Sequence, residues 1–228
     1  MNWAPDGPAR ADGPRQWLGE CLAAPDKIPA GETPRLMPPK KSSKAAPRNQ
    51  TNKATGKILS SKVLYKGQIF GVRRDEVLEP TGMRTTREVI THPGSVVVMP
   101  VLPDRRIILI RQYRHAARQF LWELVAGRID PGESVRQAAA RELIEETGYR
   151  AKRLRVFLDL FPTPGFLEER MYILLAEGLT PGEAEPEEDE KIVVKAYTRA
   201  ELKKMIQRGV LRDAKSIAGL LYYFRFLA

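Results

Sequence analysis

Beyond residue 57 the chain alternates short apolar runs with turn signals, which is typical of β-strands joined by tight connections. Five such runs come before residue 115, at positions 61–65, 68–78, 83–91, 96–102 and 107–113. Residues 96–98 and 107–110 are continuously apolar, as expected of strands that are covered on both faces. We therefore predict five strands here, with the last two in the protein core.

The pattern changes at Ser134, where local chemistry predicts a helix. Ser134 and Gln137 form an S-x-x-Q capping box, and Gly148 stands where a left-handed residue would end the helix. Residues 130–132, Asp-Pro-Gly, are typical of a turn. These signals predict a loop followed by a helix over 135–147.

The rest of the chain continues to mix strands and helices. We predict strands over 152–161 and 170–177, a helix over 199–208, and a last helix over 214–226 with Asp213 as its N-cap. Helices dispersed among strands indicate an α/β fold, here a sandwich with a mixed β-sheet. The sequence contains neither an internal repeat nor a P-loop.

Residues 1–57 differ in composition from the remainder. They hold 9 of the 18 prolines and no sustained apolar period. Their ten Lys and Arg against five Asp and Glu give +5, half of the net charge of +10 of the whole chain. Such a segment cannot bury enough apolar surface to offset its ordering, so we predict a disordered tail before a domain over 58–228.

The basic charge of this tail is typical of an arm that binds nucleic acid or an anionic membrane, but a solvated extension is the interpretation that we favour. Met37 is an alternative start of the natural chain. The sequence contains no apolar run of the signal-peptide or membrane-spanning kind. Cys21 is the only cysteine, which rules out a disulfide framework and a cysteine metal site. We therefore expect a cytoplasmic enzyme that does not enter a membrane.

Three carboxylates on the predicted helix 135–147 point to chemistry. At about 100° per residue, Glu145 and Glu146 lie about 60° and 40° to either side of Glu142. These glutamates would repel one another unless a hard cation such as Mg²⁺ neutralised them. The alternative is a solvated acidic helix face, with Arg141 pairing to its neighbours.

The surrounding residues favour the metal site. Residues 127–149 match the pattern G-x5-E-x7-R-E-U-x-E-E-x-G-U, where U is a bulky apolar residue, and Tyr149 is the one mild departure. This pattern resembles that of the Nudix hydrolases, which implies a Nudix-type α/β/α sandwich with a mixed β-sheet. Its polar and glycine positions are occupied by Gly127, Glu133, Arg141, Glu142, Glu145, Glu146 and Gly148.

The flanks of the motif resemble the ADP-ribose pyrophosphatase branch of that family. The similarity rests on QYR at 112–114, WELVAG at 122–127 and TPGFLEER at 163–170, including Pro164 about 15 residues past the motif. It covers about residues 58–227. The family loop more often reads SPGFSDE, so Thr163, Leu167 and Glu168 depart from it. These departures bear on the choice of sugar.

The resemblance implies specific roles in metal binding and proton transfer. Two or three Mg²⁺ ions, with Mn²⁺ as an alternative, would be held by the Glu142 and Glu146 carboxylates and the Ala126 carbonyl, with Glu145 completing the cluster. Arg141 would orient the carboxylates, supported by Glu133. Glu169 would be the general base, and Glu168 is the alternative because the two residues are adjacent on a loop expected to move.

Other residues are assigned to the substrate. Arg111 and Arg114 end a strand and would hold the pyrophosphate with a pair of guanidinium groups. Three further residues are assigned to the substrate: Glu123, Arg87 and Phe70. The alternative for Arg87 is an ion pair on the protein surface, and the alternative for Phe70 is a position in the core. His92 and His115 are expected to be structural.

The resulting hypothesis is a Mg²⁺-dependent hydrolase that splits ADP-ribose into AMP and ribose 5-phosphate. By resemblance, it would form a homodimer in which N-terminal strands over about 58–92 are exchanged. One alternative is another nucleoside diphosphate sugar, such as GDP-mannose. An alternative of a different class is an RNA-binding or regulatory protein on a Nudix scaffold, which the intact motif disfavours.

Overall fold

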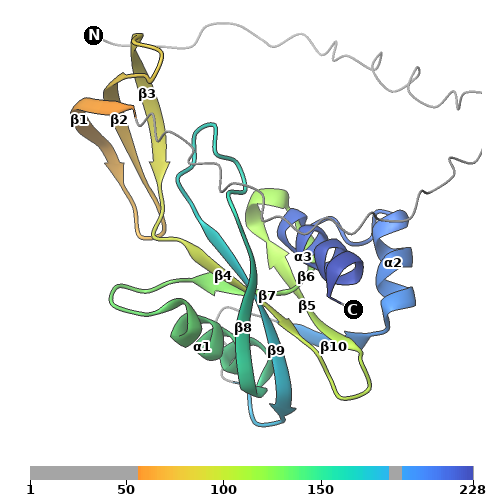
Figure 1. Ribbon diagram of the computed structural model, residues 1–228. Coiled ribbons are helices and arrows are strands. Elements are labelled where there is room, and N and C mark those ends of the chain that lie inside the picture. The colour runs from red at the N-terminus through yellow and green to blue at the C-terminus, as the bar shows by residue number, and fades with distance from the viewer. Residues whose placement is uncertain (1–55, 185–191, 228) are drawn as a thin grey trace, which may run out of the picture. The chain divides into compact units, whose positions relative to one another are not determined.

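The computed structural model describes residues 56–184 and 192–227 (Figure 1). The predicted tail lies outside these residues, apart from its last two positions, so its disorder stays a prediction. In the described ranges the strands form three sheets, and the helices are α1 (Val135–Thr147), α2 (Arg199–Gln207) and α3 (Ala214–Phe226). All three helices were predicted, with α2 one residue shorter than expected.

The first sheet is an antiparallel meander of β1 (Lys57–Lys66), β2 (Gly71–Leu78) and β3 (Arg84–Thr91). A tight turn joins β1 to β2, closed by a 2.9 Å hydrogen bond that the Gly67 N–H donates to the Phe70 carbonyl. Every residue of β1 is exposed. Strand β1 therefore contributes no buried side chain to the apolar core of its own chain.

The second sheet is mixed and has the order β7-β4-β9-β8. Strand β4 (Ser95–Pro100) runs parallel to β9 (Met171–Thr180), whereas β7 (Val125–Arg128) and β8 (Arg150–Leu160) are antiparallel to their neighbours. The prediction of a mixed sheet is confirmed. The strands of the described residues divide into three hydrogen-bonded groups, and this one is the mixed sheet.

Side chains of β4 alternate between two apolar cores. Val97 and Met99 pack in a cluster with residues of α2 and α3, including Leu202 and Leu220. On the opposite face, Val96 and Val98 pack in a second cluster that holds Ala138, Ala139 and Leu143 of α1. The sheet is thus covered on both faces, which confirms the α/β/α sandwich and the doubly covered strand predicted from its apolar run.

The third sheet has the order β10-β5-β6 and is antiparallel throughout. Strand β5 (Ile107–Arg114) was predicted, whereas β6 (Gln119–Glu123), β7 and β10 (Val193–Tyr197) were not. These three strands have only four or five residues each. Segments so short show little periodicity, so pairing with distant strands decides their conformation.

The local signals around α1 are confirmed in detail. Ser134 accepts a hydrogen bond from the Gln137 N–H, and the Gln137 side chain accepts one from the Ser134 N–H, which completes the capping box. Gly148 ends the helix in the left-handed region, at φ 74°. None of the helices in the described ranges combines the length and the apolarity that crossing a membrane requires.

Candidate active site

A cleft of about 320 Å³ lies where α1 faces β7 and the end of β5. Most of the polar and glycine positions of the motif over residues 127–149 line it, together with residues that the motif does not include. The lining consists of Ile69, Arg114, Ala126, Gly127, Arg128, Asp130, Arg141, Glu142, Glu145 and Glu146. The structure therefore brings the predicted metal ligands together in one concave site.

Two of the α1 carboxylates are turned inward against β7. Glu142 and Glu146 are only 9% and 5% exposed, and glutamates are almost never buried to this extent unless they are paired. The Ala126 N–H donates a hydrogen bond of 3.2 Å to Oε2 of Glu146, so this carboxylate is fixed to the strand beside it. The solvated acidic face that we weighed for this helix is wrong for these two residues.

Gly127 allows the strand to approach the helix this closely. A Cβ atom at position 127 would lie 1.8 Å from Oε1 of Glu142, far inside any permitted contact. Any other residue would therefore displace the Glu142 carboxylate or the strand. The glycine of the motif has a steric purpose here, since its φ is not positive.

Arg141 binds four groups around the cleft. Its guanidinium donates to Glu142 (2.7 Å), Glu145 (2.9 Å) and the backbone carbonyl of Arg128 (2.9 Å). It also holds Glu133 with two hydrogen bonds of 3.0 Å. These contacts with carboxylates raise the pKa of Arg141, so it stays charged and offsets the negative charge of the cluster.

Glu133 links the helix to the loop before it. Besides the two hydrogen bonds from Arg141, its carboxylate accepts one from the N–H of Asp130 at 3.2 Å. The hydrogen bonds from Arg141 are the main reason that the pKa of Glu133 is lowered. An ionised Glu133 therefore ties the Arg141 side chain to the turn that leads into α1.

The cleft also contains one of the two predicted arginines. Arg114 lines the cleft and makes two hydrogen bonds of 2.8 Å to Glu123. Arg111 lies three positions earlier on β5, and an odd separation along a strand points two side chains to opposite faces. It is exposed and stacks on the ring of Phe120, 4.8 Å from the centroid. The prediction that both guanidinium groups point into one site is wrong.

Glu123 does not line the cleft, contrary to the prediction that it binds substrate. Its side chain is 1% exposed and is bound by Arg114 and by Lys215 of α3. Burial, the strongest influence, would raise the pKa of Glu123, but these two cations outweigh it and the pKa is lowered. The buried carboxylate is therefore ionised, and it holds the Arg114 guanidinium by accepting its two hydrogen bonds.

The two candidate bases on the 161–170 loop have different environments. Glu169 accepts a 2.7 Å hydrogen bond from the Ser95 hydroxyl, and its Oε1 lies 3.7 Å from Nδ1 of His92. Glu168 forms an ion pair of 2.6 Å with Arg73 of β2. Neither carboxylate lines the cleft of α1 in this conformation.

The loop is held by the N-terminal sheet. The Ile90 N–H donates to the Phe166 carbonyl at 2.8 Å, and the Glu168 N–H donates to the Ile90 carbonyl at 3.1 Å. These hydrogen bonds tie the second half of the loop to β3 in this conformation, and the expectation that the loop moves stays a prediction. Closure over a bound diphosphate would require these hydrogen bonds to be exchanged.

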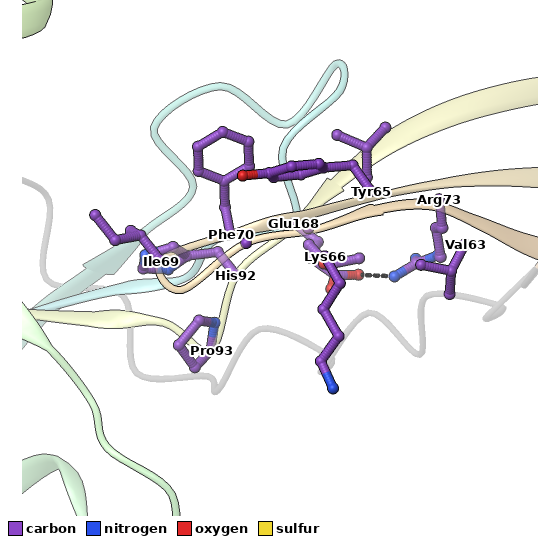
Figure 2. Close-up of a pocket in the computed structure, with 13 residues that line it drawn as sticks. Val63, Tyr65, Lys66, Ile69, Phe70, Arg73, His92, Pro93 and Glu168 are labelled. Carbon is purple, nitrogen blue, oxygen red and sulfur yellow. Dashed lines mark hydrogen bonds and ion pairs between the residues drawn. The ribbon is translucent and has the colours of Figure 1, made fainter.

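A second cavity of about 580 Å³ lies along the β1–β2 hairpin (Figure 2). Phe70 and Tyr65 line it with their ring centroids 5.8 Å apart, and the Arg73–Glu168 pair lies at its wall. Phe70 is exposed, so the core position that we weighed as the alternative for it is wrong. Ile69 lines both this cavity and the cleft, so the hairpin turn connects the two sites.

The other predicted residues lie further from the cleft. Arg87 pairs with Glu79 on the surface of the N-terminal sheet, 3.0 Å apart, which is the surface pairing that we weighed for it. His92 accepts a hydrogen bond from the Gly94 N–H, and His115 lies in a short 3-10 helix, His115–Ala117. Sequence patterns did not single out Arg73, Ser95 or Lys215, because their partners are 74 to 95 residues away.

The donor set of the cleft fits a hard divalent cation. In the described ranges no three or more His, Cys, Asp or Glu side chains converge on a preformed metal position. Mg²⁺, however, is usually bound by one or two carboxylates, with waters and substrate phosphates completing its shell. Two inward-facing carboxylates beside the glycine of β7 meet that requirement.

Comparisons with protein families agree with the geometry. The model for the NUDIX domain matches residues 91–220. A second model, described as the nucleoside diphosphate sugar hydrolase N-terminal domain, matches residues 57–90, which form the first sheet. The two matches together span almost all of the described residues.

Individual proteins are similar over the same region. A protein named ADP-ribose pyrophosphatase from Bacillus subtilis is 32% identical over 168 residues, covering 73% of this chain and 91% of the relative. A protein of the same name from Mycobacterium tuberculosis is 39% identical over 166 residues, covering 72% of this chain and 80% of the relative. A crystal structure of an ADP compounds hydrolase superposes with a TM-score of 0.66 at 27% identity, covering 75% of this chain and 94% of that one.

Proposed function

The chain belongs to the Nudix family, and on this basis we propose that it is a pyrophosphohydrolase that splits ADP-ribose into AMP and ribose 5-phosphate. The observation that carries the proposal is the charge arrangement of the cleft. Two buried carboxylates, Glu142 and Glu146, line the cleft together with Arg114. Both kinds of group serve to bind a diphosphate, because the carboxylates can hold metal cations and the guanidinium can contact the phosphate oxygens directly.

We assign the metal site to the Glu142 and Glu146 carboxylates and the Ala126 carbonyl, with Glu145 in support. When bound, two or three Mg²⁺ ions, or Mn²⁺ in their place, supply charge neutralisation at the diphosphate and lower the pKa of water. Arg141 orients the carboxylates and offsets their charge through its hydrogen bonds to Glu142 and Glu145. Arg128 and Asp130 complete the rim of the cleft.

Arg114 is the proposed direct partner of the diphosphate. A planar guanidinium matches two phosphate oxygens at once, and its charge persists at any assay pH. The hydrogen bonds from Arg114 to Glu123 further raise the pKa of this arginine. In the reaction, water adds to one phosphorus, the bridging P–O bond breaks, and the proton of the water passes to a carboxylate.

We propose Glu169 as that proton acceptor. Its present hydrogen bond to Ser95 places it at the start of β4, so the loop must move for it to reach the cleft. Glu168 is the alternative, and it would first have to leave Arg73. Both residues follow the Pro-Gly segment 162–165, whose Gly165 has open space around it.

The N-terminal sheet is proposed to serve the nucleoside and the dimer. Its match to an N-terminal domain of nucleoside diphosphate sugar hydrolases supports the first role, with Phe70 and Arg87 as candidate contacts. The exposed apolar side chains of Ile58, Val63 and Ile69 support the second, because soluble proteins seldom leave such side chains uncovered. We also propose a cytoplasmic location, consistent with the single cysteine of the chain.

The substrate is tested by a panel of diphosphate compounds. We expect ADP-ribose to give the highest kcat/KM among ADP-ribose, GDP-mannose, NADH, diadenosine polyphosphates and capped RNA, measured as phosphate release after phosphatase coupling. Leu167 replaces a residue that is often serine in the family, and a lost hydroxyl costs on the order of 1 kcal/mol. That loss is too small to reverse a large preference for the nucleoside.

Two outcomes would change the proposal in different ways. A tenfold advantage of GDP-mannose over ADP-ribose would remove the adenosine assignment and keep the metal and carboxylate roles. Absence of turnover for every compound with Mg²⁺ or Mn²⁺, combined with tight binding of RNA, would replace the enzyme by a binding protein.

A further inference from the structure

Arg114 of the cleft belongs to a group of largely buried charged side chains that also includes Glu123 and Lys215. The Glu123 carboxylate, 1% exposed, is shared by Arg114 and Lys215, whose side chain is only 13% exposed. Lys215 belongs to α3 and is 92 residues away from Glu123 in the chain. Burying ions is costly unless they are fully paired, so this group is a built feature, and the function described above uses only its Arg114.

The position of Lys215 is fixed by the first turn of α3. Its Nζ also pairs with Asp213 at 2.9 Å, and Asp213 caps the helix by accepting a 3.0 Å hydrogen bond from the Ser216 N–H. The Ser216 hydroxyl in turn accepts a 2.7 Å hydrogen bond from the N–H of Leu124, the neighbour of Glu123. The end of α3 is thereby joined to the strands that line the cleft.

This arrangement determines which edge of the guanidinium Arg114 presents. Glu123 receives its Nε and Nη2 edge, at 2.8 Å each. Among the residues that the structure describes, no hydrogen bond donated by Nη1 of Arg114 is found. Since Arg114 lines the cleft, Nη1 is available to an anion there.

The second cation on Glu123 also matters for charge. With Lys215 present, one carboxylate is divided between two cations, so Arg114 keeps attraction for an incoming anion. Without Lys215, the buried carboxylate would have Arg114 as its only strong partner, and their charges would cancel. A neutralised pair binds a diphosphate less well than a guanidinium whose carboxylate is shared.

We propose that Lys215 is a positioning residue for the diphosphate, acting through Glu123 to fix the direction and the effective charge of Arg114. The inference rests on the proposed function and adds a residue of α3 to its machinery. It also reassigns Glu123 from a substrate contact to the link between the two cations.

The test compares Lys215→Met with the wild-type enzyme on ADP-ribose at saturating Mg²⁺. We expect KM to rise about tenfold while kcat changes less than threefold, because the Nη1 edge and its charge are needed to bind the diphosphate. Lys215→Arg should restore KM to within about threefold. Lys203→Met removes an equal charge from an exposed position on α2 and should leave both constants unchanged.

A purely structural role for Lys215 would give a different pattern. It predicts a lower melting temperature with no selective change in KM, and that result would overturn the inference. If Lys215→Met does not fold, Lys215→Gln keeps a hydrogen-bond donor for Glu123 without the charge and should show the same rise in KM. An unchanged KM in the folded Gln variant would equally overturn it.

The wild-type arm separates this inference from the proposed function. Lack of wild-type turnover on any diphosphate compound would overturn the proposed function, and the role of Lys215 with it. Normal wild-type turnover with an unaltered KM in the Lys215 variants would overturn the role of Lys215 alone.

Discussion

Replacing Glu146 by glutamine should lower kcat for ADP-ribose by about 10²-fold or more, as loss of other groups that stabilise charge in a transition state does. The change keeps the shape of the side chain and its contact with the Ala126 N–H, and removes the negative charge. Glu142→Gln should behave similarly, because both carboxylates face the same cleft. The measurement is steady-state turnover over a range of Mg²⁺ concentrations.

A matched control is available on the surface. Glu177→Gln removes the same charge from β9, outside the cleft, where the side chain is 41% exposed and its carboxylate lies 3.8 Å from Arg153, and should leave turnover intact. Near-normal turnover of Glu146→Gln at saturating Mg²⁺ would show that the metal assignment is wrong. A change confined to the amount of folded protein would assign Glu146 to stability instead.

Glu169→Gln should lower kcat by about 10²-fold or more while KM stays within a few-fold, the pattern of an interaction made only in the transition state. The glutamine can still accept the hydrogen bond from Ser95, so the resting position of the loop is retained. Only the ability to accept a proton is lost. Single-turnover kinetics would separate this loss from any change in product release.

Glu168→Gln provides the adjacent comparison. It weakens the ion pair with Arg73, which ties the loop to the N-terminal sheet, and should reduce kcat only slightly. The hydrogen bonds between the loop and Ile90 remain in this variant. The reverse ranking of the two variants would transfer the role of base to Glu168.

Much of the core fold could be predicted because its signals are local. The start and end of α1 follow from the capping box at Ser134 and the glycine at 148, which act within one helical turn. The apolar run of β4 predicted a strand covered on both faces for the same reason. The division into three sheets could not be predicted, because strand pairing joins segments that are distant in the chain.

The site shows the same division between local and distant contacts. The spacing of Glu142 and Glu146 places both on one helix face, and the structure brings both into the cleft. The assignment of Arg111 beside Arg114 neglected the alternation of side chains along a strand. Lys215 could not be found from spacing alone, because it lies on α3 and its partner Glu123, at the end of β6, is 92 residues away in the chain.

The most direct test of the account is product analysis with ADP-ribose in the presence and absence of Mg²⁺. Purified protein should convert ADP-ribose into equal amounts of AMP and ribose 5-phosphate with Mg²⁺, and a chelator should abolish the reaction. Chromatography of the nucleotide and an enzymatic assay of the sugar phosphate quantify both products. Release of ADP and ribose, or no reaction with either Mg²⁺ or Mn²⁺, would contradict the account.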